Sequence, residues 1–281
     1  EFALGFSTRN YLDYIDRASW VDHHLLNVFS ANFDALIRSA YFSKDRGGKL
    51  VAGPIWDFDR AFGAATYFAT TTPNVWSIPG AVDFWRIGWW GALARDPEFM
   101  QEWIDRWQTL RRTEFSSSSL TTLVDTLTSN LATAAARDAA RWPDNVSPYG
   151  SYAAQLNRLK GWTVKRAEWI DQQFTAPPSV SVNAGNITLT ASAGAELIYT
   201  LDGSDPRSLG GGIAPNARRT SVPLTVASST NVVARSYLAA SARIFPGSPW
   251  SSAMGGPAST PVSPASRIVN LSSRALVSAG E

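Results

Sequence analysis

The chain contains no cysteine, so disulfide bonds and thiolate metal sites are excluded, although the cellular compartment stays open. Histidine is scarce as well. The two histidines, His23 and His24, have no carboxylate or thiol at the spacing of a metal site, and packing within a helix explains them better. No apolar run reaches the roughly 20 residues that a membrane helix needs. We therefore expect neither a membrane span nor a histidine-based metal site.

The chain also lacks a large excess of positive or negative side chains. Lysine and arginine number 25, aspartate and glutamate number 23, and the formal net charge is +2. That balance gives no electrostatic signature of nucleic-acid binding, so nucleic acid is not an expected partner. Aromatic residues are abundant by contrast, with 12 tryptophans that can fill a core or line a sugar or nucleotide site. The length of 281 residues favours two domains over one.

Helical periodicity dominates the first part of the chain. Asp16 is a candidate cap for a helix whose apolar positions recur every three or four residues, and the same spacing returns over residues 89–174. Between these regions the sequence predicts a β-hairpin, in which turn residues join a strand at 40–44 to a strand at 49–56. Residues 60–90 are aromatic and show no regular pattern. We expect a helix-rich domain over 1–175.

Composition changes at residues 176–178, Ala-Pro-Pro, after which Thr, Ser, Val, Gly and Pro replace the helix formers. Short strand patterns then recur between turn signals; they cover 180–182, 187–190, 197–200, 222–226 and 231–237. We expect a small immunoglobulin-like β-sandwich over 177–255 with few contacts to the helical domain. Residues 256–281 are interpreted as a linker and the start of a further β module. The predicted fold class is therefore α+β.

Polar side chains gather on both sides of the predicted hairpin. Asn27, Asn32 and Asp34 precede it, and Asp57 and Asp59 follow it. Phosphoryl transfer needs such a set, because hard oxygen ligands hold Mg²⁺ against the phosphates and a separate carboxylate orients the acceptor hydroxyl. On the residues alone, a solvated turn explains the paired aspartates equally well.

Three motifs occur here in a fixed order. A helix ends in Asn32-Phe33-Asp34, a strand follows at 39–45, and residues 53–63 read Gly-Pro-Ile-Trp-Asp-Phe-Asp-Arg-Ala-Phe-Gly. Together they resemble the CotH (spore-coat protein H) kinase family, with its Asn-x-Asp motif and its Pro-x-Trp-Asp-hydrophobic-Asp/Asn-x-x-Phe-Gly signature. A looser resemblance continues to about Phe174.

The resemblance implies the helix-rich C-lobe of an atypical protein-kinase-like fold. Asp34 would be the catalytic carboxylate, and Asn32 and Asp57 would bind ATP. Asp57, Asp59 and Asn32 would bind the metal. Asn27 is a weaker candidate, because an asparagine within a helix often hydrogen-bonds locally.

A kinase also needs an N-lobe, with a strand lysine and a loop over the phosphates, and nothing before residue 10 resembles one. Lys44 and Lys49 lie on the hairpin and are not assigned as that lysine. We therefore expect a piece of a longer precursor, with the parent protein active and this chain inactive.

The second domain has a resemblance of its own. Residues 198–206, Ile-Tyr-Thr-Leu-Asp-Gly-Ser-Asp-Pro, resemble the turn of chitobiase/β-hexosaminidase C-terminal modules, and residues 232–237 and 249–251 resemble their closing strands. An Asp-Gly step supplies a turn residue that tolerates positive φ, and Asp-Pro fixes the exit from the turn. Asp202 and Asp205 are therefore interpreted as turn formers.

The expected function is transfer of the γ-phosphoryl group of ATP, with Mg²⁺ or Mn²⁺, to serine or threonine hydroxyls of a partner protein. That partner would be a secreted, spore-coat or envelope protein of a bacterium, and this chain is expected in the same location.

The alternative is a non-catalytic surface, coat or carbohydrate-binding adhesion protein built on a degenerate kinase fold. Trp85, Trp89 and Trp90 could form a sugar platform, although helix packing explains them better, and polysaccharide binding by the β module stays open. A glycosidase is disfavoured, since such modules accompany many catalytic domains.

Overall fold

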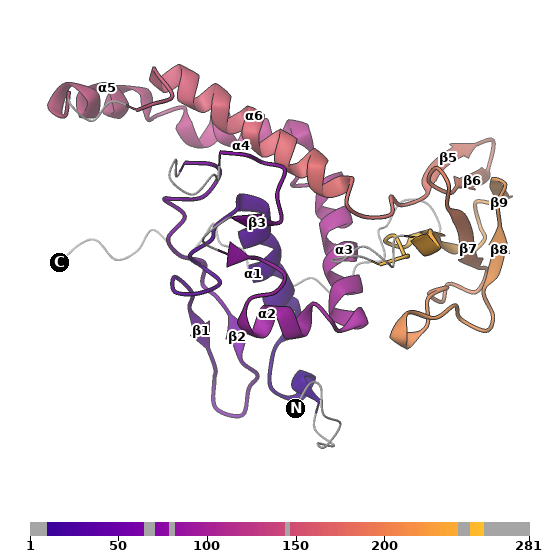
Figure 1. Cartoon of the computed structure of the whole chain (residues 1–281). Coiled ribbons are helices and arrows are strands. Elements are labelled where there is room, and N and C mark those ends of the chain that lie inside the picture. Colours follow the sequence, from indigo (N-terminus) through magenta and orange to yellow (C-terminus); the bar gives the residue numbers. More distant parts are fainter. Residues whose placement is uncertain (1–9, 65–70, 79–81, 144–146, 241–247, 256–281) are drawn as a thin grey trace.

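The computed structural model describes residues 10–64, 71–78, 82–143, 147–240 and 248–255. Helices are the main regular elements up to Asp171, and an antiparallel β region follows from Ser179, so the chain is α+β as expected (Figure 1). The proposed further module after residue 255 lies outside the described residues. Within the described part of the chain, no helix combines the length and the apolar character that crossing a membrane requires.

The first long helix is α1 (Arg17–Ser30), and the predicted cap is confirmed. The Asp16 carboxylate accepts a hydrogen bond of 2.9 Å from the backbone N–H of Ser19, one of the donors that a helix N-terminus leaves free. The helix ends at Ala31, which adopts a left-handed conformation with φ 52°. A short 3₁₀ helix, η1 (Tyr11–Asp13), precedes it.

The predicted hairpin is also confirmed, although its ladder is short. Strand β1 (Phe42–Ser43) pairs antiparallel with β2 (Val51–Ala52). The base of the hairpin is fastened to α1, because the Leu50 carbonyl accepts hydrogen bonds from the Asp16 backbone N–H at 2.9 Å and the Trp20 indole at 3.0 Å. This anchoring sets the position of the loop that follows β2.

The helical region after residue 88 is divided into separate helices. They are α2 (Gly88–Leu93), α3 (Pro97–Arg112), α4 (Ser117–Thr128), α5 (Ala132–Arg141) and α6 (Tyr152–Asp171), preceded by a small hairpin of β3 (Ser77–Ile78) and β4 (Val82–Asp83). Of these helices, α2, α3 and α6 contact α1. The core is centred on α3, where Trp103, Ile104 and Trp107 are fully buried. Helix α6 packs against both α1 and α4 (Figure 1).

Aromatic packing explains the two histidines and two of the three clustered tryptophans. His23 stacks on Trp90 with the ring centroids 5.7 Å apart, and His24 meets Trp85 edge-on at 4.8 Å. These four side chains are buried, as a packing role predicts. Trp89 differs, because its side chain is 62% exposed.

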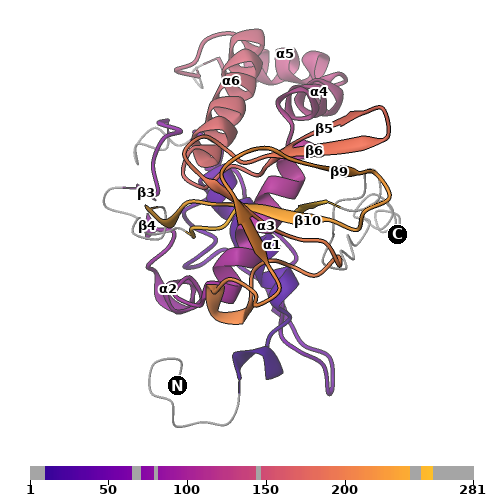
Figure 2. The ribbon, with the colours of Figure 1, turned by 90° about the vertical axis from the view of Figure 1, so that its right-hand side faces the viewer.

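The β region consists of two antiparallel sheets, seen facing the viewer in Figure 2. One holds β5 (Ser179–Asn183), β6 (Asn186–Thr190) and β9 (Leu224–Ala227); the other has the order β11 (Met254–Gly255), β10 (Val233–Tyr237), β7 (Glu196–Thr200) and β8 (Arg218–Thr220). Both sheets contribute to one core, with Leu189 from the first and Leu197 and Ala234 from the second. A short 3₁₀ helix, η2 (Leu209–Gly211), precedes β8. The five predicted strands are confirmed, and β8 and β11 were not anticipated. The expected closing strand at 249–251 is only an isolated bridge between Tyr237 and Trp250.

The expectation of few contacts between the helical and β regions is wrong. The Arg235 guanidinium on β10 bonds to Asp105 on α3 at 2.7 Å and to Asp205 at 2.5 Å, and its side chain is 4% exposed. Arg207 also pairs with Glu98 on α3 at 2.8 Å. A composition break marks where local structure changes, but it carries no information on charges that meet across the boundary.

Asp202 and Asp205 both form turns, as expected. The Asp202 carboxylate accepts a hydrogen bond of 3.0 Å from the Ser204 backbone N–H, and Asp205 accepts one of 2.9 Å from the Arg207 backbone N–H. Asp205 has the further role of binding Arg235. Its carboxylate thus connects the predicted turn to the interface with α3.

Candidate functional site

The candidate site begins where α1 ends. The backbone N–H of Asn32 bonds to the Asn27 carbonyl at 2.9 Å, so Asn32 emerges directly from the last turn of the helix. Asn27 itself is fully buried, and its side-chain amide donates to the His23 carbonyl one turn earlier at 2.8 Å. This is the local hydrogen bonding that made Asn27 the weaker candidate.

Asp34 opens a tight turn on the surface. Its backbone carbonyl accepts hydrogen bonds from the N–H groups of Ile37 at 3.0 Å, Arg38 at 2.8 Å and Ser39 at 3.2 Å. Its carboxylate is 20% exposed and lies 3.5 Å from the guanidinium of Arg60. The turn therefore holds the Asp34 side chain at a fixed place beside a cation.

Asp57 lies on the loop after β2, and two hydrogen bonds join this loop to the Asp34 turn. The Ser39 hydroxyl donates to the Asp57 carboxylate at 3.0 Å, and the Asn32 amide donates to the Asp57 backbone carbonyl at 3.2 Å. Asp57 has φ 62°, a left-handed conformation that aspartate and asparagine adopt more readily than most residues. The two predicted site loops are therefore adjacent, although 25 positions separate Asn32 from Asp57.

Asp59 is more exposed than its neighbours. Its carboxylate is 70% exposed and lies 4.0 Å from Arg60, so Arg60 approaches both Asp34 and Asp59. Asn32 is fully buried, and its Oδ1 has no hydrogen-bond partner among the described residues. The four predicted site residues thus lie on two joined loops, with three carboxylates outside and the asparagine beneath them.

Helix α6 holds the end of α1, from which the first loop emerges, and it also contacts the second loop. Arg166 is fully buried and donates to the carbonyls of Val28 at 2.7 Å and of Pro73 and Val75 at 2.6 Å. Burial lowers the pKa of Arg166 to about 9. The Val28 carbonyl belongs to the last turn of α1, where a positive charge also interacts favourably with the helix dipole. Arg158 holds the other loop, donating to the Gly63 carbonyl at 2.6 Å.

Gly63 ends the second loop at a position that only glycine fits. Its φ is +73°, and a Cβ there would lie 2.7 Å from Nε1 and 2.9 Å from Cδ1 of Trp162 on α6. We expect Gly63→Ala to cost the roughly 1–2 kcal/mol of a left-handed alanine and a further 1–3 kcal/mol for the overlap. Urea unfolding of both proteins, followed by tryptophan fluorescence, measures this loss.

Gly47 provides a matched control for that substitution. It has the same φ of +73° at the tip of the hairpin, but a Cβ there would meet nothing within 4 Å. Gly47→Ala should therefore cost only the backbone contribution. Equal losses for the two variants would show that the packing of Gly63 against α6 contributes nothing to stability.

Sequence reasoning missed three residues of this site. Ser39 follows Asp34 by five positions, the interval between the aspartate and the asparagine in the protein-kinase catalytic loop, and this spacing could have revealed it. Arg60 stands in the signature itself, but its pairing with Asp34 has no sequence signal. Arg166 contacts Val28 across 138 positions, and only the folded structure shows that contact.

A family model described as CotH kinase protein matches residues 7–170. The chain belongs to the CotH kinase family. The matched range contains α1, both site loops and nearly all of α6, so the geometry above is the geometry of a kinase-like protein. No curated protein and no solved structure matches the chain.

The donor set of this CotH kinase family member suits a hard divalent cation. Asp34, Asp57 and Asp59 supply carboxylate oxygens, which Mg²⁺ and Mn²⁺ prefer. The Asp57 carboxylate is exposed and receives a hydrogen bond from Ser39, which leaves oxygen lone pairs free. Within the described ranges, however, no group of three or more His, Cys, Asp or Glu side chains is close enough to hold a metal by protein ligands alone. Such a site suits Mg²⁺ that retains water and phosphate ligands.

Proposed function

We propose that this chain carries the catalytic loops of an atypical protein kinase, which transfers the γ-phosphoryl group of ATP to serine or threonine hydroxyls. The observation that carries the proposal is the pair of hydrogen bonds from Ser39 and Asn32 to Asp57. They bring the Asp34 turn, with the carboxylate for the acceptor, against the residue suited to the metal. Phosphoryl transfer depends mainly on such positioning and on charge stabilisation.

Each residue has a separate task in this proposal. Asp34 accepts a hydrogen bond from the acceptor hydroxyl, orients it toward the phosphorus and receives its proton as the new O–P bond forms and the bond to the ADP oxygen breaks. Asp57 would hold Mg²⁺ or Mn²⁺, with Asp59 beside it. When bound, the metal neutralises charge on the phosphates. Asn32 keeps the Asp57 backbone in place from its buried position.

Arg60 completes the arrangement as a cation between two carboxylates. At 3.5 Å from Asp34 and 4.0 Å from Asp59, it reduces the repulsion that neighbouring negative charges would otherwise cause. It also fixes the Asp34 side chain in one direction. Arg60 is 45% exposed, so this contribution is weakened by solvent screening.

The β region fits the role of a docking module. We propose that it is a chitobiase-type β-sandwich that holds the kinase-like part near an extracellular, envelope or spore-coat partner. The contacts of Arg235 and Arg207 with α3 support a fixed orientation between the two parts.

The test of the function is a transfer assay with radiolabelled ATP. The full-length protein that carries this chain is incubated with Mg²⁺ or Mn²⁺ and a mixture of serine-rich proteins, and label in protein is measured with and without a chelator. The proposal expects label that is stable to hydroxylamine, as phosphoserine and phosphothreonine are, and that disappears with the chelator. Metal-independent label, or label on an acyl group, would contradict it. If the full-length protein shows no transfer activity but binds ATP in a metal-dependent way that Asp57→Asn removes, the nucleotide site is supported and the catalytic proposal is contradicted.

A non-catalytic, carbohydrate-binding protein is the second candidate. It is favoured by the exposed aromatic pair before Asp57, in which Tyr41 and Trp56 meet edge-on at 6.0 Å and are 51% and 58% exposed. Aromatic faces of this kind also bind sugar rings. Titration with soluble polysaccharides while tryptophan fluorescence is recorded would favour this candidate if Trp56→Ala removed the response and Asp57→Asn did not.

A further inference from the structure

A groove opens beside the Asp34 turn, on the side of α2. Its volume is about 290 Å³, close to the lower limit of common ligand sites. One wall comes from the turn that Asp34 begins and from β1, and the other comes from the start of α2. The lining residues are Ala35, Leu36, Ile37, Arg38, Ala40, Phe42, Gly88, Trp89 and Trp90.

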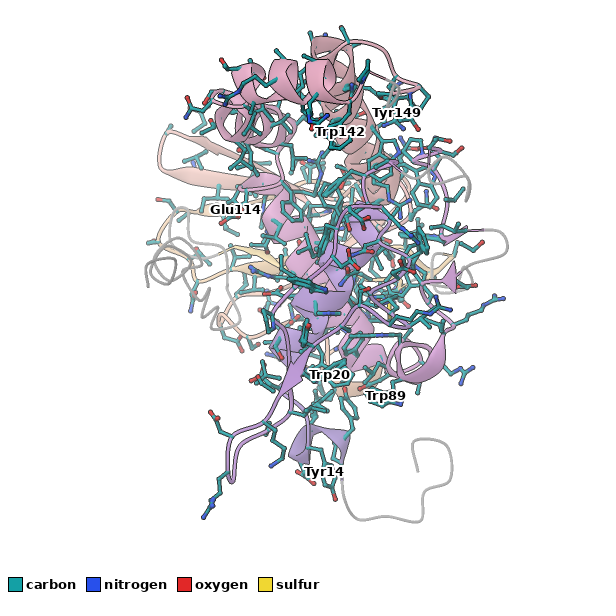
Figure 3. All side chains as sticks on the ribbon, turned by 90° about the vertical axis from the view of Figure 1, so that its left-hand side faces the viewer. Tyr14, Trp20, Trp89, Glu114, Trp142 and Tyr149 are labelled. Carbon is teal, nitrogen blue, oxygen red and sulfur yellow. The ribbon has the colours of Figure 1, made fainter. Side chains whose placement is uncertain are left out.

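The apolar part of the groove is firmly supported. The Trp89 ring is 62% exposed, yet it is packed from behind, with its centroid 5.7 Å from that of buried Trp20 and 5.9 Å from that of Phe42. Trp20 and Trp89 lie close together in Figure 3, far from Trp142 and Tyr149 at the other end of the molecule. The Trp89 ring is thus held by other rings on one side and open to solvent on the other. Such a side chain offers an apolar surface and loses little conformational entropy when a partner binds.

The charged part of the groove is Arg38. It follows Asp34 by four positions, and its backbone N–H bonds to the Asp34 carbonyl at 2.8 Å. Its side chain is exposed and makes no ion pair with any described residue, whereas Arg60 on the neighbouring loop pairs with Asp34. The groove therefore presents one positive charge that the described protein does not neutralise.

We propose that this groove binds the acceptor protein through a segment that carries an acidic side chain for Arg38 and an aromatic or large apolar side chain for Trp89 and Phe42. The chain would thus select serines and threonines that have both kinds of neighbour. The inference rests on the proposed kinase function for the identity of the bound segment, since Asp34 is the residue assigned to the acceptor hydroxyl.

Charge complementarity and continuity favour a peptide over a nucleotide here. The groove shares its wall with the Asp34 turn, whereas the metal and phosphates are assigned to Asp57 on the other loop. A single arginine matches one carboxylate, while a nucleotide would place several negative charges beside an apolar wall. Arg38 follows Asp34 by four positions on the same turn, so a segment bound in the groove lies next to the turn that carries the Asp34 carboxylate.

The test uses two synthetic peptides that bind to the intact chain. Both contain one serine and one phenylalanine; the first has a glutamate where the second has a lysine. Isothermal titration calorimetry gives Kd, and the transfer assay gives KM and kcat. The expected preference for the glutamate peptide is about fivefold in Kd, as one partly exposed ion pair contributes roughly 1 kcal/mol. The same preference is expected in KM, with little change in kcat.

Three variants separate the contributions. Arg38→Glu should reverse the preference, so that the lysine peptide binds more tightly. Trp89→Ala should weaken both peptides by about three- to tenfold, because an aromatic contact is lost in each complex. Arg46→Glu makes the same charge change in the turn of the hairpin, outside the groove lining, and should leave the preference for glutamate as it is.

The outcomes distinguish this inference from the proposed function. Peptide binding that depends on Arg38, in a full-length protein without transfer activity, would support the groove and contradict the kinase proposal. Active transfer that is indifferent to Arg38→Glu would overturn the groove and leave the kinase proposal standing. If ATP competes with the glutamate peptide and Trp89→Ala abolishes this competition, the groove binds the nucleotide. That result would also overturn the inference.

Discussion

Replacing Asp57 with asparagine is expected to remove metal-dependent phosphoryl transfer, a loss of about a thousandfold or more. A metal held by Asp57 would neutralise phosphate charge and contribute several kcal/mol to stabilising the transition state, and each 1.36 kcal/mol corresponds to a factor of ten in rate. Asparagine is the sharper choice over alanine, because it tolerates the φ of 62° at this position and can still accept a hydrogen bond from Ser39. The variant therefore removes a charge without disturbing the loop.

Two further variants separate a loss of chemistry from a general loss of activity. Asp34→Asn should lower kcat by about 10²–10⁴-fold while ATP binding changes little, since this carboxylate acts on the acceptor hydroxyl. Asp202→Ala removes an exposed aspartate from a turn of the β region and should leave activity near normal. The kinase assignment fails if Asp57→Asn and Asp202→Ala have equal activity in the same assay.

The sequence predicts local structure well because the signals for it are local. Asp16 caps α1 by accepting a hydrogen bond from the backbone N–H of Ser19, only three residues away. The hairpin turn joins two strands that are neighbours in the chain. The family signature contains Asp57, and the Asn-x-Asp motif contains Asp34; their roles stay predictions. The strand β8 was not predicted, because its three residues, Arg-Arg-Thr, do not alternate between apolar and polar side chains.

The sequence does not predict contacts between side chains that are distant along the chain. Nothing in the pattern indicates that Arg60 approaches Asp34 or that Arg166 reaches the carbonyl of Val28. The docking of Arg235 on Asp105 was missed for the same reason, since 130 positions separate them. Each of these contacts depends on the packing of whole helices and sheets, which fixes distances that no local motif encodes.

The buried histidines make the stability of the fold sensitive to mild acid. Burial lowers the pKa of both His23 and His24 to about 4, and the charge of His23 lowers that of His24 further. In the unfolded chain each pKa is about 6.5. Below pH 6.5 the unfolded state binds protons that the folded state does not. The free energy of unfolding therefore has its full value above pH 6.5 and falls as the pH drops toward 4.

The expected loss is about 3 kcal/mol for each histidine by pH 4, from a pKa difference of about 2.5 and 1.36 kcal/mol per unit. This is a large share of the roughly 5–15 kcal/mol that stabilises a typical protein. Urea midpoints measured between pH 7.5 and 5 should fall steadily below pH 6.5, in a range where most carboxylates remain ionised. The change is therefore attributable to the histidines.

A double variant, His23→Phe with His24→Gln, tests that attribution. Phenylalanine retains an aromatic ring to stack on Trp90, and the glutamine amide can donate to the Phe84 carbonyl, which lies 2.8 Å from His24 Nε2 in the native fold. Neither new side chain titrates. The double variant should show a nearly flat urea midpoint between pH 6.5 and 5, even if its stability at pH 7.5 is lower. An unchanged slope would mean that other groups, and not this histidine pair, control the acid response.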